Sequence, residues 1–113
     1  MNLSGKWSFK EEFDFGKDEG EVVLTQAGNR VYGILGFTEF IEDEIPFKVK
    51  CHLDGRLEGN KIKFEVVGVE LSSTETLEYF PEKREGIINA NGQIVGSSED
   101  EQGVCGVFVM ERV

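Results

Sequence analysis

The stretch IPFKVKCHLDGRL, residues 45–57, decides the fold class. Its apolar side chains share one parity, namely Ile45, Phe47, Val49, Cys51, Leu53 and Leu57. The opposite parity is polar and holds Lys48, Lys50, His52 and Asp54. Successive side chains of a strand point to opposite faces, so this stretch predicts a β-strand with one buried and one solvated face. Cys51 is therefore expected in the core, and His52, the single histidine, on the outer surface.

Similar alternating runs occupy the rest of the chain, and helical periodicity is absent. They predict eight strands, at residues 3–13, 20–27, 30–38, 45–57, 61–71, 77–88, 93–98 and 104–112. Glycines recur inside these strands and predict the bends that a small barrel needs. They are Gly33, Gly36, Gly68, Gly96 and Gly106. A bulge is expected near Val66, where the apolar run changes parity.

The connections between these strands alternate in character. The segments AGN (27–29), EGN (58–60) and NANG (89–92) predict tight turns, because Gly and Asn accept positive φ. The other connections are longer and acidic: DFGKDEGE (14–21), FIEDE (40–44), SSTETLE (72–78) and SEDEQG (98–103). In an up-and-down meander the tight turns share one end of the molecule and the longer loops share the other.

Closure into a barrel removes the exposed strand edges that eight short strands would otherwise leave. A sandwich is the rival architecture, but it needs longer crossovers than this chain has. We therefore predict an all-β fold, a single domain over residues 1–113 that forms an eight-stranded antiparallel up-and-down barrel.

The chain is acidic, with a net charge of −10. Such a charge repels phosphate backbones and anionic lipid surfaces, so neither nucleic acid nor a membrane is an expected partner. There is no apolar run long enough to span a membrane and no signal-peptide pattern, which favours a cytoplasmic location. Cys51 and Cys105 have no metal-binding or redox spacing, and their parities predict opposite faces, so no disulfide is expected.

The segment LSGKW (3–7), the eight-strand meander and Arg112 at the end of the last strand resemble the calycin superfamily, which includes lipocalins, fatty-acid-binding proteins and avidins. LSGKW is also similar to the first strand of avidins, and LTQAGNRVYG (24–33) is similar to the second and third strands of small bacterial lipocalin-like or avidin-like domains. The resemblance implies a structural barrel floor in which Arg112 packs over Trp7 beside Gly5. It implies no family ligand, because the chain has a single Trp, unlike avidins, and lacks the helical lid and the Arg pair of fatty-acid-binding proteins.

The predicted barrel interior and its open mouth form the candidate ligand site. Its expected residues are Glu11, Phe13, Gln26, Leu35, Phe37, Phe47, Phe64 and Ser98. Glu11, Gln26 and Ser98 would supply polar groups for specificity, or would satisfy backbone groups. Barrels of eight strands either fill their interior with side chains or hold one small ligand, and both interpretations stay open.

Acidic residues of the longer loops are expected to converge on this mouth. They are Glu11, Glu12, Asp14, Asp18 and Glu19, then Glu39, Glu42, Asp43 and Glu44, and finally Glu99, Asp100 and Glu101. Such a rim can attract a cation, a basic protein or Ca²⁺. Without EF-hand spacing, a solvated rim that aids solubility is the favoured interpretation, and no metal site is expected.

The outer wall carries apolar side chains as well. Tyr32, Ile34, Val107 and Val109 lie opposite inward-facing residues of the same strands. Strands that are apolar on both faces usually have both faces covered, which favours a homodimer through this wall. The alternative is a scatter of exposed β-branched residues.

No nucleophile elbow, phosphate loop or zinc spacing is present, so no catalytic residue and no cofactor are expected. The favoured function is a non-catalytic binding module that holds a small, partly apolar ligand through an acidic mouth. One alternative is a protein-interaction domain, such as an inhibitor or adaptor, with a filled barrel. Another is an enzyme that uses mouth carboxylates, which requires a carboxylate whose pKa is raised by burial.

Overall fold

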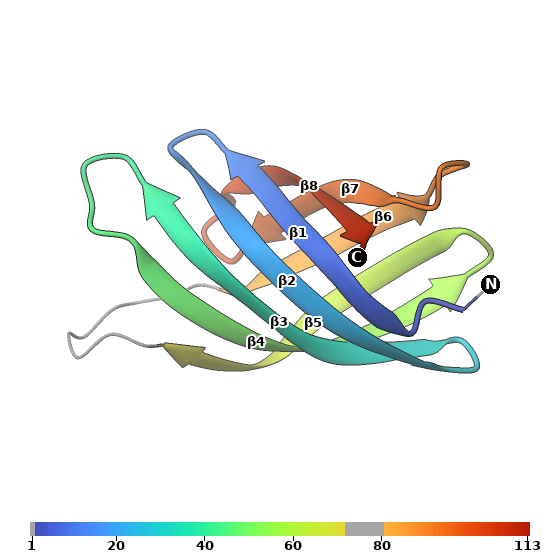
Figure 1. Ribbon diagram of the computed structural model, residues 1–113. Coiled ribbons are helices and arrows are strands. Elements are labelled where there is room, and N and C mark those ends of the chain that lie inside the picture. The colour runs from blue at the N-terminus through green and yellow to red at the C-terminus, as the bar shows by residue number, and fades with distance from the viewer. Residues whose placement is uncertain (1, 72–80) are drawn as a thin grey trace.

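The computed structural model describes residues 2–71 and 81–113. Eight strands form a closed antiparallel barrel in chain order, with β8 paired to β1 (Figure 1). Their bounds are β1 Gly5–Phe13, β2 Gly16–Ala27, β3 Arg30–Ile41, β4 Phe47–Glu58, β5 Lys61–Leu71, β6 Glu82–Ile88, β7 Ile94–Asp100 and β8 Cys105–Arg112. The predicted all-β up-and-down barrel is thus confirmed. No helix in the described part of the chain is long and apolar enough to cross a membrane.

The three expected tight turns connect β2 to β3, β4 to β5 and β6 to β7, and they share one end of the barrel (Figure 1). The expected loop at 14–21 is wrong, because β2 already begins at Gly16 and leaves only Asp14 and Phe15 between the strands. Likewise, β3 continues to Ile41 and β7 to Asp100. These strands continue through inward-facing charged side chains, which interrupt the apolar alternation that marks a strand. The expected loop at 72–78 and the part of the 77–88 strand before Pro81 lie outside the described residues.

The half of the barrel next to the tight turns is filled with apolar side chains. Trp7, Phe9, Leu24, Leu35 and Phe108 are each exposed by no more than 1%. The centroid of the Phe9 ring lies 5.9 Å from that of Phe37 and 6.5 Å from that of Phe108, which is the spacing of rings in contact. Dense packing of this kind leaves the opposite half of the barrel as the place for a site.

Interior glycines allow neighbouring strands to approach closely. A Cβ on Gly33 would lie 1.9 Å from the carbonyl oxygen of Val23, and one on Gly96 would lie 2.0 Å from that of Glu85. Both distances are far shorter than any real contact. Gly36 differs, since a Cβ there would meet nothing within 4 Å. Gly33 and Gly96 thus mark close approaches between strands, whereas Gly36 does not, and no bend is tested at these positions.

The wall between β5 and β6 is the least continuous part of the barrel. A register shift opposite His52 and Leu53 leaves Val67 as an extra residue in β5, which confirms the expected bulge. β5 pairs with β6 only from Lys61 to Phe64 among the described residues. Beyond Phe64 the two strands diverge (Figure 1).

Candidate functional site

The floor of the barrel is closed by Trp7 and Arg112, which face each other across β1 and β8. The guanidinium carbon of Arg112 lies 4.5 Å from the centroid of the Trp7 ring, within the range of a cation–π contact. Arg112 also donates hydrogen bonds to the carbonyl oxygens of Ser4 and Asn2, at 2.9 and 2.7 Å. Gly5 has a φ of 137°, and a Cβ there would lie 3.0 Å from Arg112. These contacts tie the start of the chain to its end.

The opposite half of the barrel holds a row of carboxylates on its inner face. Glu11 on β1 pairs directly with Asp18 on β2, and Asp18 pairs directly with Glu39 on β3. Their exposures are only 2%, 0% and 7%. Like charges directly opposite each other in adjacent strands destabilise a sheet, and burial adds a desolvation cost. Such a row therefore requires compensating partners.

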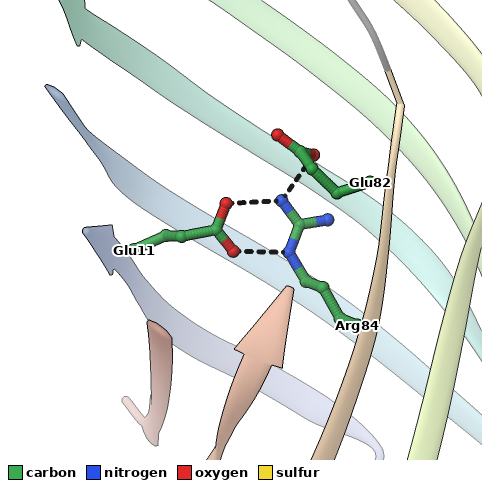
Figure 2. Close-up of polar contacts among 3 residues, drawn as sticks. All are labelled: Glu11, Glu82 and Arg84. Atoms are coloured by element: carbon green, nitrogen blue, oxygen red, sulfur yellow. Dashed lines mark hydrogen bonds and ion pairs between the residues drawn. The ribbon is translucent and has the colours of Figure 1, made fainter. Parts of the chain in front are cut away.

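Arg84 on β6 supplies one of these partners from across the barrel. Its Nε donates to Glu11 Oε2 at 2.8 Å, and its Nη2 donates to Glu11 Oε1 at 3.1 Å and to Glu82 Oε2 at 2.8 Å. Figure 2 shows the guanidinium directed between the two carboxylates. The guanidinium carbon also lies 5.2 Å from the centroid of the Phe9 ring. A buried, bidentate pair of this kind fixes the position of every group it joins.

The other two acidic residues of this row, Asp18 and Glu39, retain protons more strongly than usual. Burial is the main cause that raises the pKa of Asp18 to about 10, and the charge of Glu39 and a hydrogen bond to it add to the effect. Burial also raises the pKa of Glu39. Two ionised carboxylates have no donor for each other, so contact between them is favourable only when a proton lies on one of them. A pKa near 10 favours the protonated form of Asp18 at neutral pH.

We expected the acidic residues of the longer loops to form a solvated rim, and this expectation is wrong for three of them. Glu11, Asp18 and Glu39 face inward and are buried, whereas Glu12, Glu42 and other members of the set are exposed. The strand parity explains this result, because β2 and β3 extend further than expected and carry Asp18 and Glu39 on their inner faces.

A hollow of about 630 Å³ lies where β5 and β6 diverge. Its lining includes Val66 on β5, Glu82 on β6, Ser98 and Asp100 on β7, and Cys105 on β8. Glu82 belongs both to this lining and to the ion pairs of Arg84. Glu82 is therefore the link between the hollow and the buried ion pairs, since Glu11, Asp18 and Arg84 do not belong to the lining. Its volume is in the range of small-molecule sites.

The predicted ligand-site residues occupy three different places. Leu35, Phe37 and Phe64 belong to the packed core, and Phe13 and Phe47 are half-buried near the mouth. Glu11 and Ser98 lie in the charged half, Ser98 on the strand next to Arg84. Gln26 lies at the tight-turn end, where its side chain accepts a hydrogen bond from Leu3 N at 2.8 Å and donates one to Gly28 O at 2.9 Å. The structure thus brings Glu11 and Ser98 together and separates them from Gln26.

Sequence reasoning missed Arg84 and Glu82 as residues of the site. Both share parity with Ile88, a buried residue at the end of the same strand, and this parity is the available signal that they face inward. Their partner Glu11 lies on β1, which is not a neighbour of β6 in the barrel, so strand pairing alone does not reveal the contact.

No protein-family model matches this chain, and no curated protein sequence matches it. Solved structures do match. The barrel is similar to a redesigned β-barrel, mFAP1, solved bound to DFHBI, with a TM-score of 0.69 and 12% identity over 97% of this chain and 94% of that chain. It is also similar to a second fluorescence-activating β-barrel, designed de novo, with a TM-score of 0.60 and 15% identity over 99% and 94% of the two chains. At such identities the likeness shows the closed eight-stranded barrel and no family membership.

Proposed function

We propose that this protein is a non-catalytic binding module that holds a small, partly apolar molecule. The observation that carries this proposal is the hollow of about 630 Å³ between β5, β6 and β7, whose lining residue Glu82 accepts a hydrogen bond from the buried Arg84. A concave site with a few convergent polar groups and strongly shifted pKa values is the kind of place where proteins bind small molecules. The mFAP1 barrel, which shares this fold, was solved with a small molecule bound.

The division of the barrel into two halves supports this proposal. The apolar half is filled, so a ligand deep in the tight-turn end would have to displace Phe9, Phe37 or Phe108. At the hollow, by contrast, Val66 offers an apolar surface and Glu82 and Ser98 offer polar atoms. The ligand therefore binds between the diverging strands, with its polar end toward Glu82.

Cys105 allows a direct test of this location. It is exposed and lines the hollow, whereas Cys51 is buried, so a maleimide reagent reacts selectively at Cys105. The experiment is an NMR titration of the full chain with a library of small fragments, before and after attachment of a bulky maleimide. We expect fragments to shift the amide signals of Val66, Glu82 and Ser98, and we expect the adduct at Cys105 to abolish these shifts.

The matched control carries the same adduct at the tight-turn end, at Glu58→Cys in a Cys105→Ser background, because Glu58 is exposed and lies outside the hollow. This variant should bind fragments as the unmodified chain does. Shifts confined to other surfaces, or shifts that survive the Cys105 adduct, would refute a site at the hollow.

We also propose that the outer wall forms a homodimer interface. Val23 on β2 pairs directly with Ile34 on β3, and these side chains are 53% and 42% exposed, with Tyr32 beside them at 41%. Contiguous apolar side chains on a surface favour association. In sedimentation velocity we expect a dimer that Ile34→Lys converts to a monomer, and a wild-type monomer at millimolar concentration would contradict the proposal.

The floor geometry supports a calycin-like relationship, which we propose as the ancestry of the barrel. The stacking of Arg112 on Trp7 and the glycine at position 5 are what that resemblance implies. A natural sequence that links this chain to a calycin through intermediate homologues would support the relationship, and a family link to a different barrel class would exclude it.

A further inference from the structure

We propose that Glu11, Asp18 and Glu82 form a Ca²⁺ site inside the barrel, next to the hollow that Glu82 lines. This site goes beyond the proposed function, because it requires no organic ligand. It differs from the exposed acidic rim, since its residues face the barrel interior.

The geometry of these residues suits a calcium ion. One carboxylate oxygen from each lies within 4.8 Å of the other two, although the residues come from β1, β2 and β6. Calcium binds oxygen ligands at 2.3–2.6 Å, so oxygens on opposite sides of the ion are separated by about 4.6–5.2 Å. Carboxylate oxygens are also the donors that hard divalent cations prefer. The three strands therefore already hold the ligands at a compatible separation.

The local charge favours a cation at this position. Glu11, Asp18, Glu39 and Glu82 carry four acidic groups, and the ion pairs among the described residues bring them one guanidinium, that of Arg84. The hydrogen bonds from Arg84 use one lone pair on each Glu11 oxygen, and each carboxylate oxygen has two. Glu11 can consequently bind Arg84 and an ion together.

Asp18 provides an independent reason to place a cation here. Its side chain is 0% exposed, and neither of its oxygens accepts a hydrogen bond from a donor within residues 2–71 and 81–113. Buried polar atoms are nearly always satisfied, and those that are not call for a specific explanation. One oxygen of Asp18 lies within 4.8 Å of an oxygen of Glu11 and of one of Glu82, and ionised carboxylates offer only further acceptors. A cation is the partner that all three groups can share.

The hollow gives the ion a route to these ligands. Glu82 is only partly buried and belongs to the lining of the hollow, whereas Glu11 and Asp18 are buried and do not belong to it. An ion that enters through the hollow therefore meets Glu82 before the two buried ligands.

The test uses isothermal titration and thermal unfolding of the full chain, freed of divalent ions with a chelator, at pH 8. We expect one Ca²⁺ to bind per chain. Saturating CaCl₂ should raise Tm by roughly 5 °C or more relative to NaCl of equal ionic strength, because an ion that binds only the folded state stabilises it. Asp18→Asn should weaken binding at least tenfold, and Glu82→Gln should do so as a second variant.

The control is Glu12→Gln, which removes the same charge next to Glu11 but on the exposed outer face. It should bind Ca²⁺ as the wild type does. The proposal is overturned if CaCl₂ has no effect beyond that of NaCl. It is also overturned if Asp18→Asn and Glu82→Gln, shown by circular dichroism to be folded, both retain wild-type affinity, since the ion would then bind elsewhere.

Discussion

Asp18 lies on the inner face of β2 between Glu11 and Glu39, and burial raises its pKa from 3.8 to about 10. Between these two values the folded chain holds a proton that the unfolded chain has released. Stability falls with rising pH wherever the folded state binds more protons. The contribution of Asp18 is thus fully favourable below pH 4 and is lost progressively as pH approaches 10.

The first prediction concerns Asp18→Asn in the absence of divalent cations. Asparagine has nearly the same shape and cannot ionise, so the variant should be more stable than the wild type above neutral pH. The wild type should lose up to about 1.4 kcal/mol per pH unit through this one proton, and the variant should lose less. Urea unfolding at several values between pH 6 and 9 measures both slopes. Parallel slopes would show that Asp18 does not hold the proton.

The second prediction concerns Arg84→Met, which keeps an unbranched apolar stem and removes the charged guanidinium. Breaking a buried ion pair leaves an unpaired charge and typically costs about 3–5 kcal/mol. The loss should be visible in urea unfolding, whereas Lys83→Met, at the exposed neighbouring position, should change little. The double variant Glu11→Leu with Arg84→Met should recover most of the stability. A loss below about 1 kcal/mol for Arg84→Met would mean that the pair is not buried in solution.

At the scale of the strand, parity explains most of what sequence alone could predict. In β4 the apolar residues share one face, and Val49, Cys51 and Leu53 are indeed buried. In β2 and β3 the same rule failed at the strand ends, because Asp18 and Glu39 are charged and inward-facing. Their burial depends on partners from other strands, which local alternation does not encode.

The third prediction compares two glycines of β3. Gly33→Ala places a Cβ 1.9 Å from the carbonyl oxygen of Val23, so β2 and β3 must separate, at a cost of about 2 kcal/mol or more. Gly36→Ala meets nothing within 4 Å and should be neutral or slightly stabilising, since it reduces the freedom of the unfolded chain. Thermal unfolding of the two variants measures the difference. Equal effects would contradict the close approach of the strands at Gly33.

At the scale of the whole molecule, the meander topology could be predicted, but the site could be predicted only in part, through Glu11 and Ser98. Tight turns at alternate connections place Trp7 beside Arg112, as strand order requires. The hollow instead depends on where the pairing of β5 with β6 ends, and the ion pair of Glu11 with Arg84 crosses the barrel between strands that are not neighbours. Only the closed three-dimensional structure brings these groups together.

The central claim, that the barrel binds a small molecule at this hollow, is tested most directly by native mass spectrometry. The protein should be isolated without denaturation from the cells that produce it. We predict a mass excess of one small molecule per chain, which is absent from protein that carries a bulky maleimide on Cys105. A mass equal to that of the bare chain, or an excess that the Cys105 adduct leaves unchanged, would contradict the claim.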